Sequence, residues 1–178
     1  MGGFRALART AAAGGALILC APAIAEPTDT AVKAAFLPRF ARYVTWPAAA
    51  MPRGSDPFVL CVIGGDPFGA VLDDAARSQF VDGRRIVIRR MSSATGAENC
   101  QIAFVQGNKA QSPAQLITAF GRRSILTVTD AGNGSQRGII HFSVVGGRVR
   151  FFIDQSSAAR NGLAISSRLL ALAIGVKQ

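Results

Sequence analysis

The chain has 178 residues, 49% of them apolar, and its 20 basic residues against 10 acidic ones give a formal net charge of +10. This length suits one domain, and the apolar content excludes a disordered chain, which would lack the residues that build a core. Three cysteines are too few for a small scaffold held together by many disulfides.

The N-terminal 25 residues have the pattern of a secretory signal peptide. Two arginines precede an apolar run at residues 11–20, and alanines at positions 23 and 25 supply the small residues of a cleavage site. The run is too short to span a bilayer well. We expect cleavage after Ala25, which removes two Arg and no acidic residue and leaves a single exported domain, residues 26–178, with a net charge of +8. The alternative is lipidation at Cys20, which the large residue before it disfavours.

Cleavage after Ala25 leaves two cysteines, Cys61 and Cys100. Disulfides persist outside the cytoplasm, and one remaining pair is the simplest arrangement. We therefore expect a bridge between them, the alternative being two buried free thiols. Two cysteines and the single, distant His141 do not have the spacing of zinc ligands, so we expect no metal site.

The first element of the exported domain is predicted to be a helix over residues 30–45, because an apolar residue recurs there at every fourth position. Pro38 lies inside this helix and should kink it or end one of its turns. The next element, residues 58–63, is an unbroken apolar run, which is typical of a strand covered on both faces in a parallel sheet.

Helices and strands then alternate. An Asp or Ser followed by Pro favours the start of a helix, which predicts one helix from Asp66 to Arg77 and a second from Ser112 to about Gly121. Further strands are expected at residues 85–91, 101–106 and 125–129.

The pattern changes after residue 137. Strands at 138–145 and 148–154 flank Gly146-Gly147, a two-residue hairpin signal. A short helix ending at Asn161-Gly162 and a last helix starting at Ser166 or Ser167 should follow. The whole order predicts an α/β three-layer sandwich with a largely parallel sheet and a C-terminal antiparallel hairpin.

Nothing in the chain has the pattern of a catalytic site. His141 is predicted to lie mid-strand, with no nucleophile near it in the sequence. Gly132 and Gly134 precede a strand, whereas a dinucleotide-binding fingerprint requires a helix. We therefore expect no enzyme activity and no cofactor.

The positive charge is dispersed rather than clustered. The arginines occur singly or in pairs, with no run of five or more, and the chain has one Trp and one Tyr. Proteins that bind single strands instead interleave basic residues with stacking aromatics. An exported protein with this pattern is not expected to bind nucleic acid. A solvated basic surface is the simplest interpretation, and an acidic protein or an anionic membrane is the alternative partner.

Two groups of residues are candidate sites. In the second hairpin strand, Phe152 alternates onto the same face as Arg148, Arg150 and Asp154. An aromatic side chain among charges is typical of a partner contact, and burial of Phe152 beneath the following helix is the alternative. Ligands of open α/β sheets bind at the carboxyl ends of strands, where this chain is predicted to place Gly64, Gly65 and Asp130.

Several segments together resemble the YfiR family of periplasmic proteins. They cover nearly all of the exported domain, and their order and spacing make the resemblance fairly specific. The matching segments are Ala31–Leu37 with Trp46-Pro47, Phe58–Gly64 with Asp66–Gly69, Cys100–Val105, Ile125–Asp130, Arg148–Phe151, and Ala158–Arg160 with Gly162-Leu163, Ile165–Ser167 and Leu169-Leu170.

The resemblance implies a compact α/β domain that often forms a homodimer. Family members studied as repressors act on the periplasmic part of an inner-membrane diguanylate cyclase, and an outer-membrane lipoprotein can sequester them. Cys61 and Cys100 match a family disulfide pair. The sequence departs from the family in two places: residues 138–154 lack a second cysteine pair found in some members, which puts redox control through that pair in doubt, and Pro38 occupies a position where members have a helix-compatible residue.

The resemblance and the residues lead to two hypotheses. The first is a periplasmic, non-enzymatic repressor of such a cyclase, with Arg148, Arg150, Phe152 and Asp154 in its partner surface. The second is a periplasmic small-ligand receptor or transport accessory, with a site at the strand ends.

Overall fold

The computed structural model of the protein describes residues 27–178, so the predicted signal peptide and the lipidation alternative lie outside the described residues. Eight strands form the main sheet and two more form a small separate one. The main-sheet strands are β2 (Phe58–Gly64), β3 (Phe80–Val81), β4 (Arg84–Met91), β5 (Ile102–Gly107), β6 (Leu126–Asp130), β7 (Ile140–Val145), β8 (Arg148–Asp154) and β10 (Gly175–Lys177), and the separate pair is β1 (Val44–Thr45) with β9 (Ala164–Ile165).

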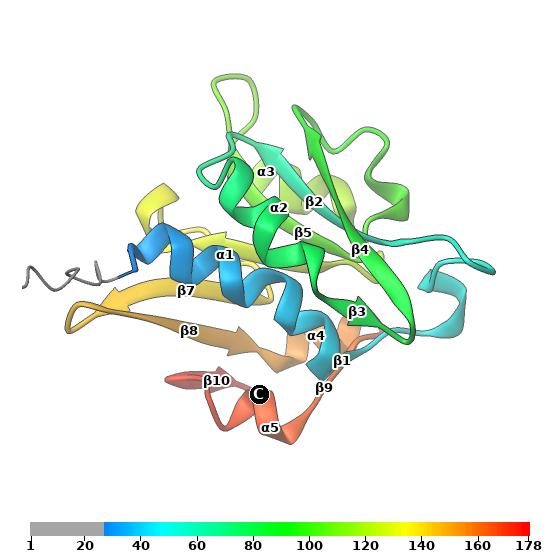
Figure 1. The fold of residues 1–178 in the computed structure, drawn as a ribbon. Coiled ribbons are helices and arrows are strands. Elements are labelled where there is room, and N and C mark those ends of the chain that lie inside the picture. Colours follow the sequence, from blue (N-terminus) through cyan, green and yellow to red (C-terminus); the bar gives the residue numbers. More distant parts are fainter. Residues whose placement is uncertain (1–26) are drawn as a thin grey trace, which may run out of the picture.

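The main sheet has the strand order β10-β8-β7-β6-β5-β2-β4-β3 (Figure 1). The five strands β4, β2, β5, β6 and β7 run parallel to one another. At the two ends of this group, β8 pairs antiparallel with β7 and β3 pairs antiparallel with β4. The unbroken apolar run of β2 lies in the interior of the sheet, between β4 and β5. The largely parallel sheet and its C-terminal hairpin are as predicted.

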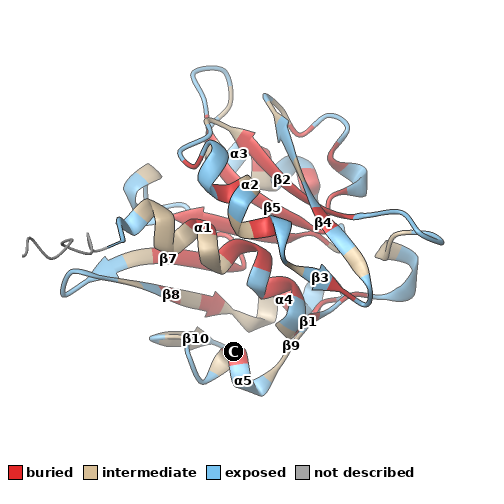
Figure 2. Cartoon of the chain, viewed as in Figure 1, coloured by how far each residue is buried: buried red, intermediate tan, exposed pale blue. Residues whose placement is uncertain are grey.

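Helices cover both faces of this sheet. Figure 1 shows α1 (Asp29–Phe40) and α2 (Ala70–Arg77) in front of the strands, with α3 (Pro113–Phe120) behind them. Apolar side chains of α1 and α2 pack with Phe58 and Leu60, whereas Leu116 and Phe120 of α3 pack with Val59 and the other residues of β2 that point backwards. Burial is therefore concentrated in the middle strands (Figure 2), and the three-layer prediction is confirmed.

The first helix is shorter than predicted. α1 ends at Phe40, and a 3₁₀ turn leads to β1, whose Val44 pairs with Ile165 of β9. The helix contains Pro38 in its last turn, where the missing N–H costs one hydrogen bond. Pairing with a strand more than a hundred residues away thus overrides the helical periodicity of residues 41–45.

Other boundaries differ for local reasons. α2 starts at Ala70 rather than near Pro67, because the Asp66 carboxylate accepts hydrogen bonds from the N–H groups of Phe68 and Gly69 and holds a turn. Ser112 caps α3, as predicted, and Gln115 completes a reciprocal capping box with it.

The C-terminal segment was expected to be mostly helical, and this expectation is wrong. It contains a single helical turn, α5 (Ser167–Leu170), which Ser166 caps, and then β10, which runs parallel to β8. The preceding short helix, α4 (Gln155–Arg160), ends where Gly162 adopts a positive φ of 74°.

Candidate functional site

The structure joins Cys61 and Cys100 in a disulfide. Cys61 lies in β2 and Cys100 just before β5, the neighbouring strand, with their Cα atoms 5.8 Å apart. Both residues are buried under α3. The bridge thus confirms the predicted pair and ties the two central strands together on the rear face of the sheet.

The rear face of β8 carries the four residues predicted to form a partner surface. Phe151 and Ile153 point to the front face and are buried in the core. The side chains at the alternate positions point to the rear face, where Arg148 and Arg150 are exposed and Phe152 and Asp154 are half-buried. The structure therefore brings the four residues together on one face. We call them the hairpin face.

Neighbouring strands and a loop contact Phe152. In the ladder it lies between His141 of β7 and Gly175 of β10. The guanidinium carbon of Arg137, from the loop before β7, lies 4.6 Å from the centre of its ring. The Phe152 ring therefore lies between Arg137 and Gly175. The sequence left two roles open for this ring, a partner contact or burial under the following helix.

A cavity of about 620 Å³ lies beside Phe152. Its lining includes His141, whose Nδ1 lies 2.8 Å from the hydroxyl of Thr129. That hydroxyl also accepts the N–H of Gly138, so Thr129 links the ring of His141 to the backbone just before β7. Burial and the charge of Arg137 lower the pKa of His141, against an opposing effect of Asp130.

Lys177 and Arg137 add cationic donors to this cavity. Asp154 lines the same cavity and binds Lys177, so Arg137 and neutral His141 are the donors that remain for a group rich in acceptor atoms, such as a carboxylate. Sequence reasoning missed the cavity, because Arg137 and Gly175 come from segments far apart in the chain and no local pattern marks either.

Asp154 is held by several donors at the end of β8. Burial opposes its ionisation, but hydrogen bonds from the N–H of Ser157, the hydroxyl of Ser156 and the ammonium of Lys177 outweigh this and lower its pKa from 3.8 to about 2. The carboxylate therefore caps α4 and anchors β10, which fixes one end of the hairpin face.

Acidification should remove this anchor. Because the pKa of Asp154 is lower in the folded than in the unfolded chain, its stabilisation is complete above pH 4 and is lost as the pH falls towards 2. We expect Asp154→Asn to be less stable than the wild type by about 2 kcal/mol at pH 7 and to differ little from it at pH 2. Urea unfolding across this pH range measures both values.

A graded variant controls this prediction. Ser156→Ala removes one donor to the carboxylate and should reproduce only part of the loss at pH 7. An Asp154→Asn variant that stays less stable by the same amount at every pH would show that the carboxylate's ionisation is not the cause.

The three residues predicted for a ligand site lie at the carboxyl ends of β2 and β6, with β5 between them. Asp130 forms an ion pair with Lys33 of α1, with 2.6 Å between Nζ and Oδ2, and accepts the N–H of Gly132. Gly64 and Gly65 lie against Gly107 at the end of β5. All three residues thus have partners within the chain, and their role in ligand binding stays a prediction.

A cluster of charged residues on the front face was also not predicted from the sequence. Arg90 of β4 donates to Asp66 and Asp73 and to the carbonyl of Gly69. Its hydrogen bonds lower the pKa of Asp73. Nothing in the sequence indicated that Asp66 and Asp73, seven residues apart, share a cation. Through these contacts Arg90 ties the start of α2 to the sheet.

A family model described as YfiR/HmsC-like matches residues 30–174. The match spans both candidate groups of residues and the disulfide. No curated protein matches the chain. Within residues 27–178, every helix is too short or too polar to cross a membrane.

Proposed function

The chain belongs to the YfiR/HmsC-like family, and from this membership we propose that it is a periplasmic regulator that binds the periplasmic part of an inner-membrane diguanylate cyclase and represses it. The repression needs no chemistry in this protein. If the regulator binds the inactive state of the cyclase more tightly than the active one, its binding shifts the cyclase towards inactivity. A homodimer, and an outer-membrane lipoprotein that sequesters the regulator, are parts of the same proposal.

The hairpin face is our proposed partner surface. It combines two exposed arginines with an aromatic ring, and Arg and aromatic residues are enriched among those that dominate binding energy. Arg137 and Gly175 already hold Phe152 in place, which reduces the entropy lost on binding. The exposed guanidinium groups favour an acidic patch on the cyclase.

The test reverses charge and removes the ring. We expect Arg150→Glu and Phe152→Ala each to raise cellular cyclic-di-GMP several-fold in cells that carry the cyclase, because each removes an anchor of the interface. Arg53→Glu makes the same charge change in the exposed loop before β2 and should leave the level unchanged. Unchanged repression by folded Arg150→Glu and Phe152→Ala proteins would exclude the hairpin face.

The cavity beside Phe152 favours a second candidate function, that of a small-ligand receptor or transport accessory. Its volume of about 620 Å³ lies within the range of sites that bind small molecules, and its donors would suit a carboxylate. A thermal-shift screen against nucleotides, amino acids and cell-wall fragments tests this function. A ligand that raises the melting temperature with occupancy, and fails to do so in His141→Phe, would support it.

A further inference from the structure

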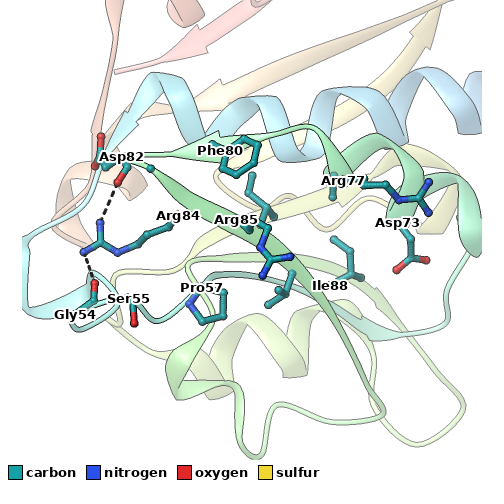
Figure 3. A pocket seen from close by; sticks show the side chains of 14 residues that line it. Gly54, Ser55, Pro57, Asp73, Arg77, Phe80, Asp82, Arg84, Arg85 and Ile88 are labelled. Carbon is teal, nitrogen blue, oxygen red and sulfur yellow. Dashed lines mark hydrogen bonds between the residues drawn. The ribbon is translucent and has the colours of Figure 1, made fainter.

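A cavity of about 860 Å³ lies at the end of the sheet opposite to the hairpin face, along β4 (Figure 3). Its lining includes all five residues from Arg84 to Ile88. Because successive side chains of a strand point to opposite faces, a cavity lined by five consecutive residues follows the edge of the strand rather than one of its faces.

This edge is largely open. β3 pairs with β4 only through Phe80 with Arg85 and Val81 with Arg84. Beyond that point, residues 86–91 pair with β2 on one side, and among the described residues no strand lies on the other. An unpaired strand edge offers a row of N–H and C=O groups to another chain.

The turn before β4 defines which groups point outwards. Asp82 and Gly83 have φ angles of 47° and 77°, as in the two-residue turn that makes the flanking Val81 and Arg84 a hydrogen-bonded pair. The backbone groups of a strand alternate in direction. Those of Ile86, Ile88 and Arg90 are therefore directed away from β2.

The surroundings of this edge are basic. Arg85 and Arg89 are exposed on the rear face of β4. At one end of the cavity Arg84 donates to the carbonyls of Asp82 and Gly54, as Figure 3 shows, yet its buried Nε has no partner. Asp73, at the other end, is already bound to Arg90. The lining also holds the exposed Asp82, against the guanidinium groups of Arg77, Arg84 and Arg85, so cationic donors outnumber carboxylates along the edge.

Apolar side chains accompany the charge. Phe80 is 50% exposed and Val87 39% exposed. Exposed apolar residues within a polar rim are typical of a contact surface.

We propose that the β4 edge binds an extended acidic segment of another protein, which adds a strand to the sheet. Backbone hydrogen bonds to Ile86, Ile88 and Arg90 would supply the affinity. Phe80 of β3 already occupies the place opposite Arg85, so acidic side chains at alternate positions of the segment would lie opposite Val87, diagonally from Arg85, and opposite Arg89. A second copy of this chain fits the edge poorly, because antiparallel pairing of β4 with itself would bring the exposed arginines of both copies onto one face, either opposite or diagonally next to one another.

The experiment selects the segment without assuming its sequence. The protein is purified from cells that express the full chain and is used to select from a displayed library of random decapeptides. We expect enrichment of peptides with acidic residues at every second position. The dissociation constant of the best peptide, synthesised with blocked ends, is then measured by fluorescence anisotropy.

Matched variants locate the binding. Ile88→Pro removes an outward N–H, at an edge position where proline is tolerated, and should weaken binding at least tenfold. Ile88→Ala loses the same side-chain packing but keeps the N–H, and should weaken it less than threefold. Arg85→Glu with Arg89→Glu, which leaves the backbone intact, should also weaken it at least tenfold.

Three results would overturn the proposal. One is that the library yields no peptide, and another is that the selected peptides bind Ile88→Pro and Ile88→Ala equally. The third is self-association of the wild type in sedimentation that Ile88→Pro abolishes, since the occupant would then be a second copy. Protection of the Ile88 amide from hydrogen exchange in the peptide complex would support the added strand.

Discussion

Replacing both Cys61 and Cys100 by Ala is expected to lower the free energy of unfolding by about 4 kcal/mol. The bridge joins residues 39 positions apart, and in the chain-entropy model closing a loop of this length restricts the unfolded chain by about that amount. The loop contains α2, β3 and β4, so the bridge limits the freedom of about a quarter of the described chain. Urea unfolding followed by circular dichroism measures the loss.

Thermal unfolding should show the same change as a fall of about 10 °C in the melting temperature. The wild type with a reductant is the control: because both sulfurs are buried beneath α3, the folded protein should resist reduction until it unfolds. Equal unfolding free energies for the oxidised wild type and the double variant would show that the bridge adds nothing to stability.

Gly64→Ala is expected to destabilise the protein by about 3 kcal/mol. Gly64 has a φ of 93°, a conformation that side chains disfavour, and a Cβ built there would lie 2.3 Å from the carbonyl oxygen of Gly107. The obstacle is backbone, so strands β2 and β5 would have to separate to admit a methyl group. Backbone strain and overpacking of this kind each cost about 1–3 kcal/mol.

Gly65→Ala is the matched control for this variant. Its Cβ would lie 3.3 Å from the side-chain amide of Gln106, which can move aside, so the effect should stay below about 1 kcal/mol. Chemical unfolding of the two variants measures the difference. A fully stable Gly64→Ala protein would mean that the close approach to Gly107 is not what requires glycine, and would favour the ligand-site hypothesis for this position.

The sheet could largely be predicted from the sequence because its strands carry strong local patterns. The apolar run of β2 and the alternation in β8 each give a signal that depends only on nearby residues. Strands of two or three residues give no such signal, so β1, β3, β9 and β10 were missed. The pairing of β1, β9 and β10 depends on contacts between segments that are distant in the chain, whereas β3 is joined to β4 by the turn at Asp82-Gly83.

The candidate site likewise has a part that the sequence predicts and a part that it does not. That Arg148, Arg150, Phe152 and Asp154 share a face follows from the two-residue period of a strand. What surrounds them does not: Arg137 reaches Phe152 from a loop. Asp66 shows the same limit, since an Asp before a Pro can cap a helix or hold a turn. Here a turn formed, and Arg90, 24 residues later, binds the same carboxylate.

Gly175 of β10 has a consequence for how this sequence can vary. A Cβ at this position would lie 2.9 Å from the ring of Phe152, so positions 152 and 175 share a single volume. A chain with a larger residue at 175 would need a smaller one at 152 for β10 to stay paired and for Lys177 to remain within reach of Asp154. In related sequences, the side-chain sizes at the two positions should therefore covary, a larger residue at 175 accompanying a smaller one at 152.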